Sequence, residues 1–278
     1  MKPPHKSLNS ETHVQANVRQ ILSLSGGKDS TALALYMKDK VQNMEYVFCD
    51  TDKELPETYE YLKKLTVHLG REIVYLKAEG YNFDDLLARR NGYLPSPQAR
   101  WCTELLKIKP FEKYVGDDTV VSYIGIRADE PHRKGYVSTK PNIKARFPFI
   151  EDGLRQADIV RILKSSKLGL PTYYDWRSRS GCFFCFYQQR REWVGLLENH
   201  PELFELAKTY EKIDPVTKIQ YTWVDGESLE DLAKPERIKQ IKEDYERKQK
   251  EKTLFKANTP LHAVFGNETT QGCAMCSF

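Results

Sequence analysis

Short apolar runs alternate with helical patterns in the first half of the chain. The runs at residues 18–25, 46–49, 73–76 and 120–126 have the length of buried strands. Helical patterns begin near Lys28, near Tyr59 and near Phe83, each after one of the first three runs. Because strands that alternate with helices form parallel βαβ units, we predict an α/β fold with a doubly wound, mostly parallel sheet.

The pattern changes after about residue 150. Helical patterns follow at 154–163 and 192–210, and residues 229–252 are very rich in Glu, Lys and Arg. This last segment is typical of a solvated helix, and a nucleic-acid-binding face is the alternative. We therefore expect a flexible polar arm over residues 1–16, an α/β domain over 17–150 and a mostly helical, cysteine-containing extension over 151–278.

Composition indicates a globular protein. Of the 278 residues, 40% are hydrophobic and 29% are charged. No stretch approaches the roughly 18 apolar residues that cross a bilayer, and no apolar stretch follows the charged start of the chain, so we expect a cytoplasmic protein and no membrane partner. The net charge of +4, from 43 Lys and Arg against 39 Asp and Glu, permits a polyanionic partner without indicating one.

The sharpest local signal lies between the first strand and the first helix, where the chain reads Ser25-Gly26-Gly27-Lys28-Asp29-Ser30. Glycines let the backbone approach an anion closely, and the helix then points its first amides and its dipole at that anion. Lysine at a helix start opposes the dipole unless an anion is bound there. We predict a phosphate-binding loop, with an ordinary strand-to-helix turn as the alternative.

This loop lacks the spacing of the kinase-type P-loop and resembles the signature of N-type ATP pyrophosphatases, the PP-loop family. These enzymes have an adenine nucleotide α-hydrolase-like fold and cleave ATP between the α and β phosphates. The resemblance implies ATP and Mg²⁺ as cofactors and catalytic roles for Lys28, Asp29 and Asp50, the last at a strand's carboxyl end. The implied ATP-binding residues are Ser25, Gly26, Gly27, Lys28, Asp29 and Ser30.

Further motifs indicate which members of this family the chain resembles. Residues 49–58, 125–133 and 170–185 resemble segments of phosphoadenylyl-sulfate reductases. Iron–sulfur adenylyl-sulfate reductases carry adjacent cysteines where this chain has Cys102 and Thr103. The sequence from Arg100 to Pro110 looks instead like the ATP pyrophosphatase of bacterial DNA phosphorothioation systems, of the DndC and SspD type. That likeness implies sulfur insertion into a DNA backbone phosphate, with DNA, a cysteine desulfurase and other proteins of the system as partners.

The same resemblance suggests which cations meet the substrate phosphate. Each of them taken singly is also consistent with a surface cation, except that Arg127 lies within a motif and is a catalytic candidate together with Cys102. The candidates are Arg100, Lys107, Lys109, Arg127 and Arg133.

The six cysteines suggest a metal site, because thiols in a reducing compartment form metal clusters rather than disulfides. Two pairs, Cys182 with Cys185 and Cys273 with Cys276, have a spacing that suits one metal. The family resemblance implies a 4Fe–4S cluster on Cys102, Cys182 and Cys185, with Cys273 or Cys276 as the fourth ligand. Structural Zn²⁺ on the two pairs, and simple burial of small apolar side chains, are the alternatives.

Four of the cysteines have further interpretations. A tail cysteine, Cys273 or Cys276, or Cys102 could carry sulfur as a persulfide if it stands outside the metal site. Cys49, before Asp50, is expected to serve packing.

Two other functions remain open. One is a sulfonucleotide reductase, which needs no ATP; the intact glycine loop argues against it, because the reductases generally carry an altered version. The other is a non-catalytic nucleotide- or zinc-binding module of a modification complex. Release of pyrophosphate from ATP, with and without DNA, distinguishes the three.

Overall fold

The computed structural model describes residues 18–133, 138–213, 216 and 220–258. Five strands form one sheet in the order β3-β2-β1-β4-β5, and every neighbouring pair is parallel. This confirms the predicted α/β fold with a parallel sheet. The strands are β1 (Arg19–Leu24), β2 (Met44–Cys49), β3 (Ile73–Leu76), β4 (Val120–Tyr123) and β5 (Ile143–Arg146).

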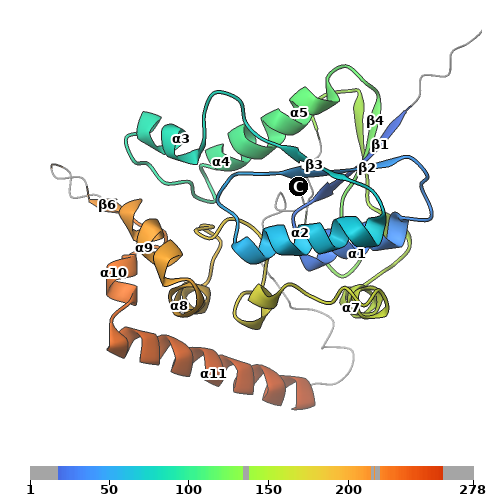
Figure 1. Ribbon diagram of the computed structural model, residues 1–278. Coiled ribbons are helices and arrows are strands. Elements are labelled where there is room, and N and C mark those ends of the chain that lie inside the picture. The colour runs from blue at the N-terminus through green and yellow to red at the C-terminus, as the bar shows by residue number, and fades with distance from the viewer. Residues whose placement is uncertain (1–17, 134–137, 214–215, 217–219, 259–278) are drawn as a thin grey trace, which may run out of the picture.

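Alternate side chains of the central strands face opposite layers of helices. Leu22 and Leu24 of β1 point into a core shared with the helices on one face of the sheet, whereas Ile21 points into a core with the helix on the other face. Figure 1 shows these two layers, with α1, α2 and α7 below the sheet and α5 above it. The first layer consists of α1 (Lys28–Met37), α2 (Pro56–Leu69) and α7 (Gln156–Ser165), and the helix of the second layer is α5 (Lys109–Val115).

Two elements of the sheet domain were not predicted. β5 is an edge strand whose sequence Ile-Lys-Ala-Arg buries only Ile143 among its hydrophobic residues, so it has no apolar run. The other element is a helical stretch that begins with α4 (Trp101–Thr103), continues as the π-helical turn η1 (Glu104–Ile108) and ends with α5. The predicted strand at 120–126 is also shorter, because β4 ends at Tyr123.

The region after residue 150 is mostly helical, as predicted. Its helix α7 packs against α1 and so belongs to the first layer of the sheet domain. The remaining elements are α6 (Pro148–Glu151), η2 (Thr172–Asp175), α8 (Arg190–Asn199), α9 (Pro201–Thr209), β6 (Lys212–Ile213), β7 (Gln220–Tyr221), α10 (Leu229–Leu232) and α11 (Pro235–Asn258).

Aromatic side chains join this helical region to the sheet domain. Phe184 stacks on Trp223 with ring centroids 5.0 Å apart, and it also contacts Phe83 of α3 (Phe83–Arg89) at 4.3 Å. Trp193 of α8 is fully buried in the same cluster. This third core, separate from the two beside the sheet, holds the helical region against α3 and α4.

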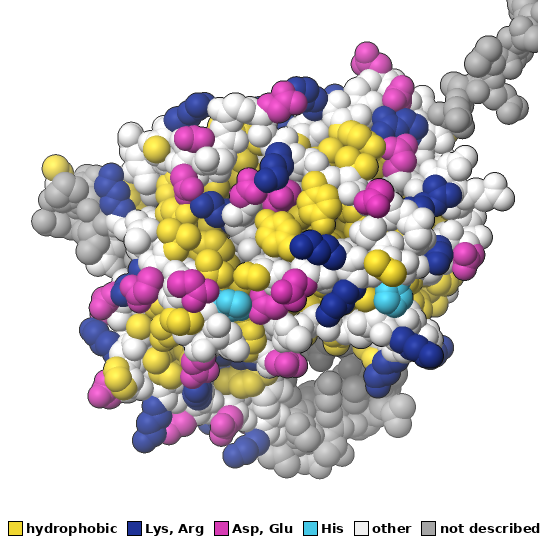
Figure 2. Space-filling model, in the orientation of Figure 1, with side chains coloured by type: hydrophobic (Ala, Val, Ile, Leu, Met, Phe, Trp, Pro, Cys, Tyr) yellow, Lys and Arg dark blue, Asp and Glu magenta, His cyan; other side chains and the backbone are white. Residues whose placement is uncertain are grey.

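The surface carries mixed charges. Figure 2 shows Lys and Arg side chains interspersed with Asp and Glu over the face drawn, without a patch of one sign. Among the described residues, no helix is long and apolar enough to cross a membrane.

A buried carboxylate fixes the segment that precedes α8. Glu192 has no exposed surface, and its Oε1 accepts hydrogen bonds from the amide and the hydroxyl of Ser178, at 2.8 and 2.5 Å. Its Oε2 accepts from the amide of Gln189 at 2.9 Å. Glu192 therefore ties the first turn of α8 to the loop after η2.

We expect Glu192→Ala to lower the free energy of unfolding by about 2–4 kcal/mol, because it leaves buried donors without an acceptor. Glu192→Gln is the matched control: it keeps an acceptor for Ser178 and loses the one for Gln189, so it should cost less. Urea denaturation measures both. Equal stability of Glu192→Ala and the unmodified protein would contradict this role.

Candidate functional site

The glycine loop, residues 25–30, lies where the strand order reverses. β1 pairs with β2 on one side and with β4 on the other, so the connections from β1 and β4 leave in opposite directions. In open α/β sheets, ligands bind in the crevice at this point, outside the carboxyl ends of the strands. The loop follows β1 and Asp50 follows β2. The sheet thus brings these two predicted site elements to one edge.

Both glycines of the loop are required by close approach within the chain. Gly26 has φ of +70°, and a Cβ there would lie 2.5 Å from Cγ2 of Thr58. A Cβ on Gly27 would lie 2.5 Å from Oγ of Ser180 and 3.2 Å from the hydroxyl of Tyr174. The loop is therefore shaped by α2 on one side and by residues 171–182 of the C-terminal region on the other.

Three serine hydroxyls form a buried chain beside the loop. Oγ of Ser25 lies 3.0 Å from Oγ of Ser30, and the hydroxyl of Ser180 donates to Ser25 at 3.2 Å. Ser30 in turn donates to the carbonyl of Gly27 at 3.3 Å, and the amide of Ser25 donates to Ser30 at 3.1 Å. Hydroxyl groups rotate freely, so this chain can redirect its donors toward an anion.

Two tyrosines of the same segment hold the backbone of the loop. The amide of Lys28, the first residue of α1, donates to the hydroxyl of Tyr174 at 3.0 Å, and Nζ of Lys28 lies 5.6 Å from the centre of that ring. Tyr173 donates to the carbonyl of Gly26 at 2.9 Å. Burial raises the pKa of Tyr174 to about 12, so its hydroxyl stays neutral beside the lysine. The N-cap residue Gly27 offers no side-chain cap, and the Tyr174 hydroxyl is the acceptor for the first amide of α1.

Arg127 links the glycine loop to the segment after β4. Its guanidinium contacts Asp29 and Asp129, both at 2.9 Å, and Glu130 at 3.4 Å. Arg133 contacts Glu130 at 3.1 Å. Two of the three arginines predicted to meet a substrate phosphate therefore lie in one cluster with three carboxylates, next to α1.

Asp50 is buried and held by three donors. Its Oδ1 accepts from the hydroxyl of Tyr59 at 2.7 Å and from the amide of Asp52 at 2.9 Å, and its Oδ2 lies 3.4 Å from Nζ of Lys77. These contacts orient the carboxylate at the end of β2. Its predicted role toward ATP or Mg²⁺ remains a prediction.

A second polar cluster lies around Cys182. The thiol is 3.2 Å from the hydroxyl of Thr51 and donates to Oε1 of Glu54 at 3.6 Å, and Nζ of Lys107 lies 3.7 Å from the same oxygen. Burial, followed by the charge of Glu54, raises the pKa of Cys182 well above its ordinary value, and nearby Cys102 adds a smaller rise. Oε2 of Glu54 has no hydrogen-bond partner among the described residues.

The described residues bring together part of the predicted metal site. Cys102 lies near Cys182, and the amide of Cys185 donates to the carbonyl of Cys182 at 3.1 Å. Within residues 18–258 as described, no three His, Cys, Asp or Glu side chains converge to hold a metal ion. Cys273 and Cys276 lie outside the described residues. The described cysteines alone therefore do not complete a cluster or zinc site.

The other singled-out residues have local roles. Cys49 is buried in the core between the sheet and α5, burial raises its pKa to about 12, and its thiol donates to the carbonyl of Lys107 at 3.4 Å, in keeping with packing. Lys109 is exposed and lies 3.8 Å from Glu104. The guanidinium of Arg100 lies 5.8 Å from the ring centre of Tyr187.

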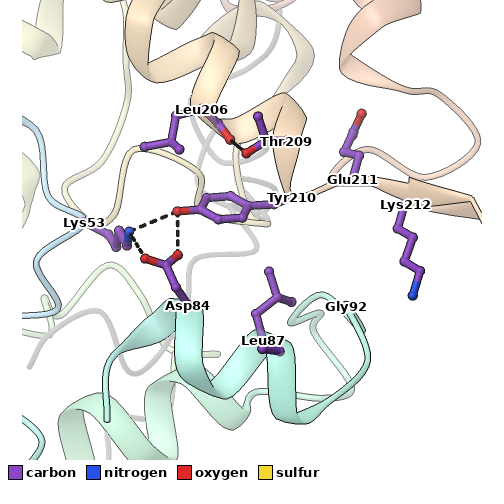
Figure 3. Close-up of a pocket in the computed structure, with 10 residues that line it drawn as sticks. Lys53, Asp84, Leu87, Gly92, Leu206, Thr209, Tyr210, Glu211 and Lys212 are labelled. Atoms are coloured by element: carbon purple, nitrogen blue, oxygen red, sulfur yellow. Dashed lines mark hydrogen bonds and ion pairs between the residues drawn. The ribbon is translucent and has the colours of Figure 1, made fainter.

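A cavity of about 510 Å³ lies between α3 and the end of α9, and none of its lining residues was predicted to form the site. Figure 3 shows Lys53, Asp84 and Tyr210 in mutual contact in its wall. Lys53 donates to Asp84 at 2.7 Å and to Tyr210 at 3.0 Å, and Tyr210 donates to Asp84 at 2.7 Å. The polar groups of these three residues form hydrogen bonds with one another. We therefore interpret the cavity as part of the junction between the sheet domain and the helical region.

Several residues at the loop were not predicted. Tyr173, Tyr174 and Ser180 contact it from the C-terminal region, and Glu54 contacts Cys182. The two tyrosines and the serine lie within residues 170–185, the segment that resembles the reductases. That resemblance was the one sequence feature that could have pointed to them. Nothing in the sequence paired them with residues 25–30.

The chain is similar in part to several known proteins. An uncharacterized protein of Methanocaldococcus jannaschii is 26% identical over 193 residues, which cover 66% of this chain and 45% of that protein. The tRNA-specific 2-thiouridylase MnmA of Buchnera aphidicola is 28% identical over 126 residues, 40% of this chain and 34% of that enzyme. The chain thus spans less than half the length of either relative.

Among solved structures, the phosphoadenylyl-sulfate reductase of Candida auris aligns with a TM-score of 0.48 and 15% identity, over 60% of this chain and 82% of that one. The profile of the phosphoadenosine phosphosulfate reductase domain matches residues 19–163. This match covers β1 to α7, the glycine loop and Arg127, which is more than half of the chain. The chain therefore belongs to the phosphoadenosine phosphosulfate reductase domain family.

Proposed function

We propose that this protein is an ATP pyrophosphatase that adenylates a DNA backbone phosphate for sulfur insertion, with a cysteine desulfurase as partner and other phosphorothioation proteins beside it. One observation supports the proposal: the buried hydroxyls of Ser25 and Ser30 lie 3.0 Å apart in the loop that leads from β1 into α1, at the switch point of the sheet, and Lys28 is the first residue of that helix. Such an arrangement suits the pyrophosphate end of ATP. The intact loop favours this function over a sulfonucleotide reductase.

Adenylation solves a leaving-group problem. Direct attack of sulfide on a phosphate diester would expel oxide, which is a very poor leaving group. In the proposed reaction a non-bridging oxygen attacks the α phosphorus of ATP, and the bond to the β phosphate breaks to release pyrophosphate. The outer sulfur of a cysteine persulfide then attacks the activated phosphorus, and AMP leaves with that oxygen. A second thiol attacks the cysteine sulfur of the resulting P–S–S–Cys linkage, which frees the phosphorothioate and forms a disulfide. A thiol reductant must then reduce this disulfide to restore the two thiols. The relative named as a tRNA thiouridylase supports sulfur transfer to a nucleic acid as the general class of reaction.

The chain's own residues bind and orient the reactants in this proposal. Lys28 and the helix amides offset the charge that builds up on the pyrophosphate. Asp29 holds Arg127 at 2.9 Å, so the guanidinium stays next to the loop, where it can face a substrate phosphate. When bound, Mg²⁺ offsets further negative charge, and Asp50 is the residue that we propose to hold it.

The cysteines are proposed to form a 4Fe–4S cluster. Cys102, Cys182 and Cys185 would supply three ligands and Cys273 or Cys276 the fourth, with structural zinc as the alternative. A cysteine left outside the metal site is the natural carrier of a persulfide from the desulfurase. The cations Arg100, Lys107, Lys109 and Arg133 are the further candidates for contact with DNA.

We expect the purified protein to release pyrophosphate from ATP in the presence of DNA. Lys28→Ala should lower the rate roughly 100- to 1,000-fold, because it removes a charge that stabilises the transition state, and Ser25→Ala should lower it less. Lys63→Ala, on the exposed side of α2, is the matched control and should leave the rate unchanged. A coupled pyrophosphate assay measures all four proteins.

Other outcomes would identify other functions. Reduction of adenylyl sulfate to sulfite without ATP cleavage would identify a reductase. ATP binding without turnover, with DNA and desulfurase present, would identify a non-catalytic module. Full activity of Lys28→Ala would overturn the role of the loop.

We expect anaerobically purified protein to be coloured and to contain iron and sulfide, as thiolate-bound clusters do. Cys182→Ser should lose both the visible absorption and the iron, whereas Cys49→Ser should keep them, because Cys49 lies in the core beside α5. Metal analysis and the visible spectrum provide the measurement. Colourless protein with stoichiometric zinc would replace the cluster by a zinc site.

A further inference from the structure

Ser180 is a buried hydroxyl that the predicted loop does not include. The residue is 6% exposed, and its Oγ lies 3.2 Å from Oγ of Ser25. The same oxygen lies 2.5 Å from the position that a Cβ on Gly27 would take. Ser180 therefore contacts the glycine loop at Ser25 and Gly27, although it comes from the C-terminal region.

The backbone around Ser180 is fixed from both sides. Arg177 is 1% exposed and donates to the carbonyls of Gly181 and Cys182, at 3.1 and 2.7 Å. On the other side, Ser178 is bound to the buried carboxylate of Glu192. These contacts hold the backbone on both sides of Ser180 and keep its side chain beside the loop.

The hydroxyl of Ser180 can exchange its hydrogen bond to Ser25 for one to a bound phosphate. In the chain from Ser180 through Ser25 and Ser30 to the carbonyl of Gly27, each hydroxyl has a single proton to donate. A phosphate oxygen in the crevice is a stronger acceptor than a neutral hydroxyl, because it carries charge. Turning Ser180 toward it breaks one contact, with Ser25, and leaves the segment in place.

We propose that Ser180 is a third hydroxyl of the phosphate site and donates a hydrogen bond to the pyrophosphate part of ATP. This inference rests on the proposed binding of ATP at the glycine loop. It assigns a binding role to the C-terminal region, so the phosphate site is built from both parts of the chain. Tyr174 of the same region accepts from the amide of Lys28 and so holds the start of α1 beside Ser180.

Calorimetry with three ligands tests the assignment. For Ser180→Ala we expect the Kd of inorganic pyrophosphate and of ATP to rise by a common factor of about 10 to 100, the effect of one hydrogen bond to a charged group. The Kd of adenosine should stay unchanged, because adenosine has no phosphate. A purely structural role would not separate the ligands in this way.

Ser178→Ala is the matched control, because it loosens the same segment without removing a hydroxyl from the loop. It should lower the melting temperature and leave the Kd of pyrophosphate within about twofold. If it weakens pyrophosphate binding as much as Ser180→Ala does, the position of the segment and not the Ser180 hydroxyl matters, and the assignment is wrong. If Ser180→Ala does not fold, Ser180→Cys, with its weaker donor, must show the same selective rise.

Different results would overturn the proposed function and the proposed role of Ser180. Unmodified protein that binds neither ATP nor pyrophosphate would overturn the proposed function. Unmodified protein that binds both, with a Ser180→Ala variant that binds them equally well, would leave the function standing and remove Ser180 from the site.

Discussion

The close approach of Gly27 to Ser180 is the constraint on which the site depends. A Cβ at Gly27 would overlap the serine oxygen at 2.5 Å, so the loop after β1 and residues 171–182 can pack together only with glycine there. That packing brings Tyr174 to the first amide of α1. The conformation of the phosphate loop is therefore a property of the whole chain and not of the sheet domain alone.

Sequence patterns predict the strands that carry apolar runs and miss the one that does not. β1 and β2 are central parallel strands and are largely buried, and β3, although it lies at one edge of the sheet and exposes Val74 and Tyr75, keeps an apolar sequence. β5 lies at the edge and alternates apolar with charged residues, which hides it among loops. The helical stretch at 101–115 was missed because its π-helical turn interrupts the regular spacing of a helix.

The candidate site could likewise be predicted only in part. The loop, Asp50 and Arg127 could be placed at one edge of the sheet, because the carboxyl ends of parallel strands share an edge. Their partners could not be predicted: Lys28 meets Tyr174 across 146 positions of sequence, and such a pairing depends on how the third core packs. The carboxylates that surround Arg127 and the contact between Glu54 and Cys182 depend equally on the folded chain.

Ser180 and Cys182 are separated only by Gly181, whose φ of +126° favours glycine. The serine contacts the loop after β1, and the cysteine contacts Thr51 in the loop after β2. Three consecutive residues therefore span two neighbouring strand ends and set the separation between a hydroxyl and a thiol. An insertion or deletion of one residue here would shift one group out of register with the other, so the length of this tripeptide is as constrained as its composition.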